Sequence, residues 1–236
     1  VIVGAGPAGL VTALALASQG VSVTLAAPPI SEAGARADTR TTALFGGSIE
    51  LLRHIGVWAE LEATAAPLVG LRLVDDTGGL LRAPETTFRA SEVGLPCFGY
   101  NIDNAVLTRT LAHQVPAQGS LIGWRRGVVE QVLPRSDIVE VICAPPARAL
   151  TAQLVVGADG RHSFCRSAAG IAIERWSYPQ SALAVRFAHT RSHDGISTEF
   201  HRRAGPFTTV PLRGAWSSLV WVDTAAEVKR LQHLAD

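Results

Sequence analysis

Five residues near the start of the chain have the types and spacing that bind the pyrophosphate of a dinucleotide. They are Gly4, Gly6, Pro7, Ala8 and Gly9, a Gly-x-Gly-x-x-Gly pattern after a short apolar run. The first glycine permits a tight turn, the second lets the backbone approach a phosphate, and the third lets a helix pack closely on a strand. The helix N-terminus would offer free N–H donors to the phosphates. The alternative is a glycine-rich turn in an unrelated α/β fold.

Asp159 and Gly160 form the second candidate site. They end the sequence Leu-Val-Val-Gly-Ala-Asp-Gly, which predicts a buried strand, a tight turn and then a helix. In a functional interpretation Asp159 contacts a nucleotide and Gly160 is needed for the turn. A purely structural interpretation is also simple, because an aspartate at this place can cap the helix that follows.

One residue that a dinucleotide site normally has is missing. The second strand of such a site usually ends in an acidic residue that binds the adenosine ribose. Here the strand runs into Ala26, Ala27 and Pro28, with Ala27 near the place of the acid. We therefore expect a ribose contact that is weaker or comes from elsewhere.

The elements that would position these residues alternate between strand and helix. Residues 1–3 and 21–25 are predicted strands on either side of a helix over 7–18 that is apolar on all faces. Further expected elements are a polar loop over 28–42, a helix over 44–55, a hairpin of 68–75 with 80–82, a helix capped by Asp103 that ends before Pro116, a hairpin of 127–133 with 138–143, and a strand over 153–156.

The pattern changes after Gly170, where four strand-like segments follow one another over 183–187, 197–201, 207–211 and 217–222. The predicted fold class is therefore α/β: a Rossmann-like dinucleotide-binding domain in residues 1–170, followed by the start of a β-sheet-rich domain in residues 171–236. The chain opens at Val1 within an apolar run, so we expect it to be a fragment.

Composition excludes several classes of function. The 236 residues are 47% hydrophobic and 17% charged, which is ordinary for a globular protein. A net charge of +1 gives no basis for nucleic-acid binding. Three separated cysteines and seven scattered histidines predict no disulfide framework and no metal site, and they fit a reducing cytoplasm. Glycine and proline interrupt the uncharged N-terminal segment, which argues against a membrane span.

Taken in order, the motifs resemble the class A flavoprotein monooxygenases of the 4-hydroxybenzoate hydroxylase type. Three more segments are similar to the branch that hydroxylates ubiquinone precursors. The first is Asp-Thr-Arg-Thr-Thr-Ala-Leu at 38–44, which continues to Ile-Gly-Val-Trp at 55–58. The second is Gly-Tyr-Asn-Ile at 99–102, and the third is Gly-Pro-Phe at 205–207, which continues to Val-Pro-Leu at 210–212. The resemblance covers essentially the whole chain. A Gly-Asp motif that the family carries further downstream is not found, which agrees with a fragment.

The resemblance implies roles for particular residues. Gly4, Gly6 and Gly9 would hold the FAD pyrophosphate, and Asp159 with Gly160 would serve both FAD and NAD(P)H. Arg40 would lie against FAD and assist the pyridine nucleotide, since a guanidinium offers several fixed donors to phosphate. Asn104 would contact the flavin side. The alternatives are a solvated loop arginine at 40 and an ordinary first-turn helix residue at 104.

The resemblance also implies the reaction. NAD(P)H would reduce FAD, and a flavin C4a-hydroperoxide formed with O2 would hydroxylate a prenylated phenol precursor of ubiquinone. No catalytic side chain can be assigned from the sequence. We expect a cytoplasmic protein with peripheral contact to the inner membrane, and a complex with other proteins of ubiquinone biosynthesis.

Three other functions fit parts of the pattern. One is a related monooxygenase acting on a soluble aromatic acid or a polyketide. A second is a reductase or halogenase, although a halogenase would need a lysine near the flavin and Lys229 is the single lysine. The third is a non-catalytic binding protein that kept the fold, like the Rab escort type, which the missing acid at Ala27 slightly favours.

Overall fold

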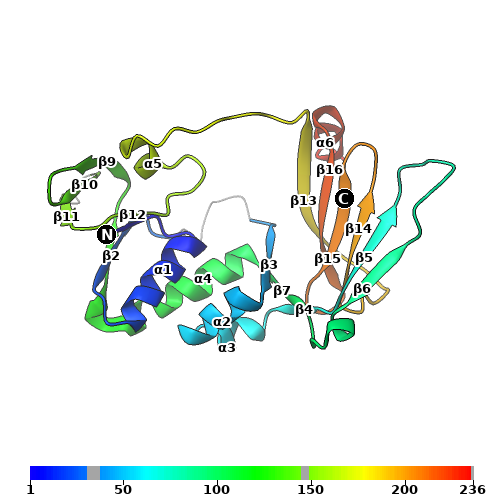
Figure 1. The fold of residues 1–236 in the computed structure, drawn as a ribbon, viewed down its shortest axis with the longest axis horizontal. Coiled ribbons are helices and arrows are strands. Elements are labelled where there is room, and N and C mark those ends of the chain that lie inside the picture. Colours follow the sequence, from blue (N-terminus) through cyan, green and yellow to red (C-terminus); the bar gives the residue numbers. More distant parts are fainter. Residues whose placement is uncertain (31–37, 145–148, 235–236) are drawn as a thin grey trace. The chain divides into compact units, whose positions relative to one another are not determined.

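The computed structural model describes residues 1–30, 38–144 and 149–234. The chain forms two compact units, each assembled from separate stretches of sequence (Figure 1). Unit 1 comprises Val1–Arg36, Leu51–Ala59 and Val106–Arg175, and unit 2 comprises Ala37–Glu50, Glu60–Ala105 and Trp176–Asp236.

The last boundary, after Arg175, lies close to the predicted boundary between residues 170 and 171. The division differs in that residues 37–50 and 60–105, which were predicted to belong to the first domain, group with the C-terminal segment. The physical reason is strand pairing over a long sequence separation: β5 (Gly70–Asp75) pairs in parallel with β14 (Ile196–His201). Hydrophobic patterning along the chain does not reveal such a pairing.

Unit 1 contains a four-stranded parallel sheet in the order β12-β1-β2-β8. Its strands are β12 (Val156–Gly157), β1 (Ile2–Val3), β2 (Val23–Ala27) and β8 (Ile122–Arg126). The helix α1 (Pro7–Ser18) follows β1 directly and contacts β1, β2 and β8. The predicted strand–helix–strand unit is thereby confirmed, whereas the strand expected over 153–156 is β12, which begins only at Val156 and ends at Gly157.

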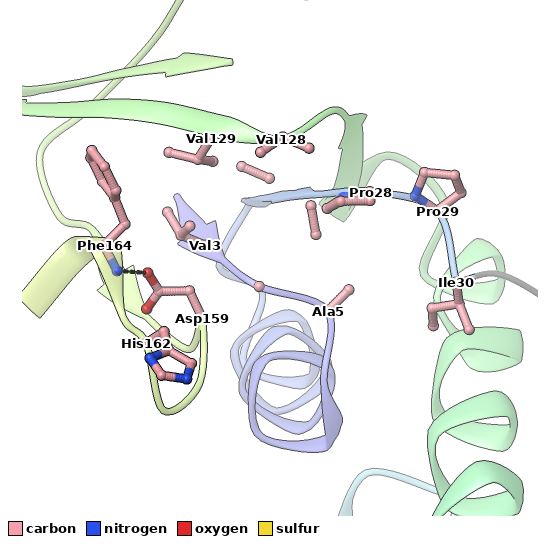
Figure 2. Close-up of a pocket in the computed structure, with 13 residues that line it drawn as sticks. Val3, Ala5, Pro28, Pro29, Ile30, Val128, Val129, Asp159, His162 and Phe164 are labelled. Atoms are coloured by element: carbon pink, nitrogen blue, oxygen red, sulfur yellow. Dashed lines mark hydrogen bonds between the residues drawn. The ribbon is translucent and has the colours of Figure 1, made fainter. Parts of the chain in front are cut away.

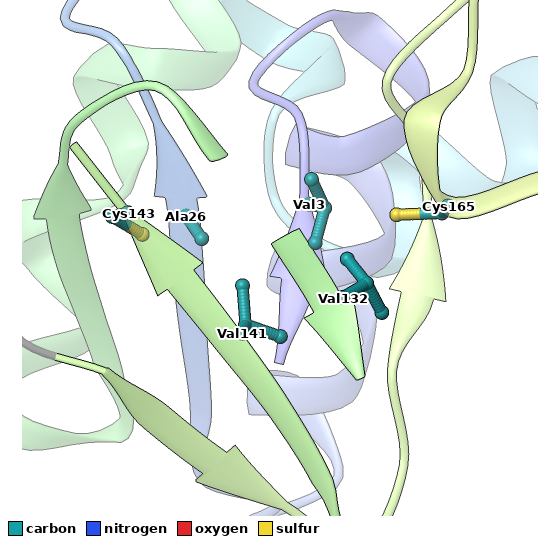
Figure 3. Packing of buried hydrophobic residues seen from close by; sticks show 6 residues of the cluster. All are labelled: Val3, Ala26, Val132, Val141, Cys143 and Cys165. Atoms are coloured by element: carbon teal, nitrogen blue, oxygen red, sulfur yellow. The ribbon is translucent and has the colours of Figure 1, made fainter. Parts of the chain in front are cut away.

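A second sheet of unit 1 joins β11 (Leu150–Ala152), β10 (Val139–Cys143) and β9 (Val129–Pro134) in antiparallel pairs. This confirms the predicted hairpin of 127–133 with 138–143. Apolar side chains from both sheets and from α5 (Phe164–Ala168) form one core cluster (Figure 3). Its buried members are Val3, Ala26, Val132, Val141, Cys143 and Cys165.

The main sheet of unit 2 has six strands in the order β13-β16-β15-β14-β5-β6. The strands not yet given are β13 (Gln180–Ala188), β16 (Trp216–Thr224), β15 (Pro206–Pro211) and β6 (Thr86–Arg89). All neighbours pair antiparallel except β14 with β5. The four strands expected after Gly170 are all present.

The hairpin predicted from 68–75 and 80–82 is wrong in its second strand, because β5 pairs with Thr86–Arg89 instead. The intervening loop is organised by Asp75. Its carboxylate accepts the Thr77 hydroxyl at 2.7 Å and the Ala83 N–H at 2.9 Å. These bonds, the hydroxyl first, lower the pKa of Asp75 to about 2. Residues 80–82 are therefore part of a loop that a charged carboxylate closes.

A smaller antiparallel sheet of unit 2 has the order β3-β7-β4. It consists of β3 (Thr41–Phe45), β7 (Gly99–Asp103) and β4 (Ala66–Leu68). The buried Asn101 amide donates to the Pro211 carbonyl at 2.9 Å and so ties this sheet to β15.

The strand β3 also corrects two expectations. The helix predicted over 44–55 is α2 (Gly46–His54), and the loop predicted over 28–42 ends where β3 begins. Residues 31–37 of that loop lie outside the described residues.

The remaining helices are α3 (Trp58–Glu62), α4 (Asn104–Gln114), α6 (Ala225–Leu231) and the 3-10 helices Ala90–Val93 and Pro116–Leu121. The Asp103 carboxylate accepts the Ala105 N–H at 3.0 Å, as expected of a residue that caps α4. Within the described residues, no helix has the length and apolar character needed to cross a membrane.

Candidate dinucleotide-binding site

The glycine turn after β1 is shaped by close backbone contacts. Gly4 has φ +109°, and a Cβ there would lie 2.2 Å from the carbonyl oxygen of Ala158. A Cβ at Gly9 would lie 2.1 Å from the carbonyl oxygen of Gly4, so α1 sits directly on the turn. Neither position accepts a side chain, and Gly4 also joins the first motif to the residue before Asp159.

Gly6 differs from its two neighbours in the motif. A Cβ placed there would meet no protein atom within 4 Å, and its φ of −74° suits any residue. The protein itself therefore does not require glycine at this position. An approaching ligand does explain it, because the absence of a side chain lets a phosphate reach the backbone.

The N-terminus of α1 presents backbone donors that have no acceptor within the helix. No side chain caps Gly6, and the first turn carries no acidic residue. The first hydrogen bond of the helix runs from the N–H of Leu10 to the carbonyl oxygen of Gly6, at 3.0 Å. Pro7 has no N–H to donate. By helix geometry the N–H groups of Ala8 and Gly9 have no acceptor within the helix. Together with the dipole of a 12-residue helix, they form a site for an anion.

Asp159 is held by the turn that it begins. One carboxylate oxygen, Oδ1, accepts the Ser163 hydroxyl at 2.6 Å, and Oδ2 accepts the N–H groups of Phe164 at 2.6 Å and Cys165 at 3.0 Å. Burial by itself would raise the pKa of Asp159, but these hydrogen bonds outweigh it and the pKa is lowered. The carboxylate is therefore charged and fixed at the start of α5. Gly160, with φ +81°, has the left-handed backbone that the predicted turn required.

A cavity of about 350 Å³ lies beside both motifs (Figure 2). Its wall contains the ends of β1 and β2, the start of the glycine turn at Gly4 and Ala5, and Asp159. The rest of the lining is mostly apolar and comes from residues 28–30, 128–129, His162 and Phe164. The position is the carboxyl edge of a parallel sheet, where open α/β folds bind their ligands.

Two other predicted site residues lie in unit 2. Arg40 donates through Nε to Asp38 Oδ1 at 2.7 Å and through Nη2 to Asp38 Oδ2 at 2.8 Å, while its side chain is 70% exposed. The Thr42 hydroxyl donates to the Asn104 side-chain oxygen. Asp38 has a lowered pKa, chiefly because of Arg40, with a smaller contribution from a hydrogen bond to Asn104. These four side chains form one polar network.

The structure thus brings the predicted site residues together in two groups. The glycines of the first motif, Pro7, Ala8, Asp159 and Gly160 belong to unit 1, and Arg40 with Asn104 belongs to unit 2. Sequence reasoning missed Asp38 as the partner of Arg40, although it stands two residues away. It also missed His162 and Phe164 in the cavity wall, for which the sequence carries no signal beyond their closeness to Asp159.

Two curated relatives extend over nearly the whole chain. The 3-demethoxyubiquinol 3-hydroxylase of Escherichia coli is 31% identical over 99% of this chain and 59% of its own length. Ubiquinone hydroxylase UbiL of Rhodospirillum rubrum is 35% identical over 94% of this chain and 51% of its own length. The chain therefore spans about half to three fifths of the length of these relatives.

Solved structures agree on the fold. A variant of PqsL from Pseudomonas aeruginosa matches 98% of this chain with a TM-score of 0.80 at 22% identity. The p-nitrophenol 4-monooxygenase PnpA of Pseudomonas putida also matches 98%, with a TM-score of 0.78 at 18% identity. At these identities the likeness concerns the fold alone.

A family model agrees with the local geometry. The model described as an FAD binding domain matches residues 1–232, which include the glycine turn, Asp159 and both units. An open Gly6 at an uncapped helix N-terminus, beside a cavity at the carboxyl edge of a parallel sheet, is what such a domain needs for a pyrophosphate. The chain belongs to the FAD-binding domain family.

Proposed function

We propose that this protein is an FAD-dependent hydroxylase that acts on an aromatic ring, with a prenylated phenol precursor of ubiquinone as its substrate. The observation that carries the proposal is the glycine turn, in which Gly6 is open to a ligand although the protein does not need glycine there. The activities for which the two curated relatives are named support the choice of substrate.

The residues of unit 1 fit the adenosine and pyrophosphate half of FAD. Backbone donors at Ala8 and Gly9 would bind phosphate oxygens, and Asp159 would hold the adjoining turn in place. When bound, FAD supplies the redox chemistry, taking a hydride from NAD(P)H and using O2 to place one oxygen atom on the ring. The balance is one phenol, one O2, one NAD(P)H and one proton, giving the hydroxylated ring, water and NAD(P)+.

Unit 2 would contribute the substrate side and the nicotinamide nucleotide contact. Arg40 carries five N–H donors, of which Asp38 occupies two, so donors remain for a phosphate of NAD(P)H. Asn104 acts within the same network through Thr42 and Asp38. The six-stranded sheet would form a wall of the ring-binding site, and the protein must exclude water there so that reducing equivalents are not wasted.

We propose in addition a peripheral contact with the inner membrane and with other proteins of ubiquinone biosynthesis. The support is chemical, since a prenylated phenol partitions into lipid. Sedimentation of the full-length protein with liposomes would test the contact with lipid. A protein that stays in the supernatant at all lipid concentrations would contradict it.

The proposed activity is tested by the visible absorbance of the full-length protein. Flavin bands that bleach on addition of NADPH, and bleach faster with a prenylphenol than with a simple benzoate, are the expected result. Equal acceleration by both compounds would favour a monooxygenase of another aromatic substrate. A colourless protein that also fails to bind added FAD would instead indicate a non-catalytic binding protein.

A further inference from the structure

Two adjacent leucines are exposed in the loop between β5 and β6, residues 76–85, which we call the apex loop. Leu81 is 95% exposed and Leu80 is fully exposed. The apex loop projects from the edge of the six-stranded sheet of unit 2 (Figure 1). Single exposed leucines are common on globular proteins, but neighbouring ones with no polar residue between them indicate an interaction site.

Hydrogen bonds hold the apex loop in this conformation. The Asp75 carboxylate accepts the Thr77 hydroxyl at 2.7 Å and the Ala83 N–H at 2.9 Å, and so closes the loop behind the two leucines. The N–H of Asp76 donates to the His201 carbonyl at 3.0 Å and fastens the loop to the end of β14. Because the loop is already ordered, placing its tip in another phase costs little conformational entropy.

Positive charge lies beside the leucines. Arg82 follows them directly along the chain. The parallel pairing of β14 with β5 places the turn over 202–205, which carries Arg203, at the same end of the sheet. Both arginines are exposed, and within the residues that the structure describes neither forms an ion pair with a carboxylate. A guanidinium can bind phosphate oxygens while its aliphatic stem stays beside an apolar surface.

Most acids at this end of the sheet are already paired. Glu85 lies 3.7 Å from Arg72, and Asp223 lies 3.4 Å from Arg202, measured between nitrogen and oxygen. A third carboxylate closes the apex loop, as described above. Among the described residues of the apex loop, Asp76 remains as an exposed acid that forms no ion pair. The two unpaired arginines outnumber it, so the charge around the leucines favours an anionic surface.

We propose that the apex loop inserts Leu80 and Leu81 into the surface of an anionic lipid bilayer, with Arg82 and Arg203 on the headgroup phosphates. The partner is lipid because a projecting loop offers far less than the roughly 800 Å² that each side contributes to a stable protein interface. Two leucines give a weak and reversible contact with a bilayer, which the arginines strengthen. The inference rests on the proposed function, since a substrate dissolved in lipid gives such a contact its purpose.

The first experiment is sedimentation of the full-length protein with vesicles of phosphatidylcholine and phosphatidylglycerol in equal parts. The double variant Leu80→Ser with Leu81→Ser should bind these vesicles about tenfold or more weakly than the parent. The matched control is Val93→Ser, which removes a 66% exposed side chain from the 3-10 helix at the other end of β6 and should change nothing. Unchanged binding of the leucine variant, or an equal loss in the control, would overturn the inference.

A second pair of variants tests the charges. Arg82→Gln with Arg203→Gln should remove the preference for phosphatidylglycerol over phosphatidylcholine alone, while the weaker binding to phosphatidylcholine is kept. Arg191→Gln changes an exposed arginine between β13 and β14, at the opposite end of the sheet, and should leave the preference as it is. A preference that survives in the double variant would overturn the assignment of the headgroup contacts.

A dye on the loop shows whether the leucines enter the lipid. Leu80→Cys in a Cys97→Ser background is labelled with a nitrobenzoxadiazole dye, again in the full-length protein. Its emission should shift to the blue when vesicles are added, whereas the emission of dye on Val93→Cys should not. A cysteine at position 80 that the reagent cannot reach without lipid would show that another part of the chain or a second copy covers the loop, and would overturn the inference.

The two proposals fail in different ways. A protein that binds FAD and hydroxylates a detergent-dispersed prenylphenol, but binds no vesicles, would overturn this inference alone. A protein that binds vesicles through the two leucines, but takes up no FAD, would overturn the proposed function alone. If both proposals hold, the leucine variant loses its binding to vesicles and keeps its activity towards the detergent-dispersed substrate.

Discussion

The N–H of Phe164 donates to the Asp159 carboxylate at 2.6 Å, so the acid of the second motif is bound to the helix that follows it. The N-cap residue of α5 is Ser163, whose hydroxyl accepts the N–H of Arg166. Asp159 is not the N-cap itself, but it accepts two further N–H groups of the first turn of α5, as the structural interpretation requires. A role of Asp159 in binding the nucleotide remains a proposal, which depends on the groups that this turn exposes to the cavity. The backbone of Gly4 packs directly against Ala158 at the start of the same turn, so the two motifs are in contact.

Replacing Asp159 with asparagine should destabilise the protein. Both carboxylate oxygens accept hydrogen bonds from the turn, whereas an asparagine amide has only one oxygen that can accept. We expect a loss of about 1–2 kcal/mol in the free energy of unfolding at pH 7. Since the pKa of Asp159 is lowered from 3.8, its contribution is present above that pH and is lost as the pH falls through the folded-state pKa. Urea unfolding between pH 2 and pH 7 measures both effects.

The control for that series is Asp137→Asn, which changes an exposed carboxylate in the turn between β9 and β10. It should leave the free energy of unfolding at pH 7 within about 0.5 kcal/mol of the parent value. A similar loss in both variants would show that the turn of Asp159 has no special importance.

Gly4→Ala should lower the stability of the protein, whereas Gly6→Ala should lower its affinity for FAD. A Cβ at Gly4 would clash with Ala158 and the residue has a positive φ, so we expect Gly4→Ala to unfold or to lose several degrees of thermal stability. Gly6→Ala has free space and an ordinary φ, so its unfolding temperature should not change. Its affinity for FAD should nevertheless fall at least tenfold, because the methyl group occupies the path of the phosphate.

Thermal unfolding without cofactor and titration with FAD separate the two effects. A Gly6→Ala variant that binds FAD as well as the parent would contradict the assignment of the pyrophosphate to this turn.

Arg40→Ala should change nucleotide binding much more than stability. Arg40 is 70% exposed, and an exposed ion pair of this kind contributes about 0–1 kcal/mol. We expect the KM for NAD(P)H to rise about tenfold, and Arg40→Lys to recover only part of this because an ammonium cannot form the same fork. The measurement is steady-state oxidation of NAD(P)H together with urea unfolding.

A matched control exists in unit 1. Arg135 forms a similarly exposed ion pair with Glu140, with an N–O distance of 2.7 Å. Arg135→Ala should leave the KM unchanged. An equal effect in both variants would mean that only the net charge matters.

Cys165 should be the least reactive kind of thiol. Burial and the neighbouring Asp159 carboxylate raise its pKa to about 11. Iodoacetamide at pH 8 should therefore label Cys97, which is partly exposed, well before Cys165. A raised pKa stabilises the folded state below the ordinary value of 9.0, so the free energy of unfolding should fall as the pH rises from 9 towards 11.

Mass spectrometry of the labelled peptides gives the order of reaction, and Cys165→Ala should abolish the alkaline loss of stability. Labelling of Cys165 at the rate of Cys97 would show that the core beneath α5 opens readily.

The sequence by itself determined the local features of this protein. The glycine spacing, the apolar run of α1 and the Asp-Gly turn are short-range patterns, and each appears in the structure where it was predicted. The strands after Gly170 were also predicted, because alternation of apolar residues depends only on neighbours along the chain. The family resemblance followed from the order of these motifs.

Only the tertiary structure decided which segments belong together. Parallel pairing of β5 with β14 joins residues more than 120 positions apart, and it moves residues 60–105 out of the unit that holds the glycine turn. Tertiary structure also tied Asn101 to the Pro211 carbonyl and brought Val128 and Phe164 into the same cavity wall. Such contacts depend on hydrogen bonds and packing between distant segments, and hydrophobic periodicity does not encode which distant segments will meet.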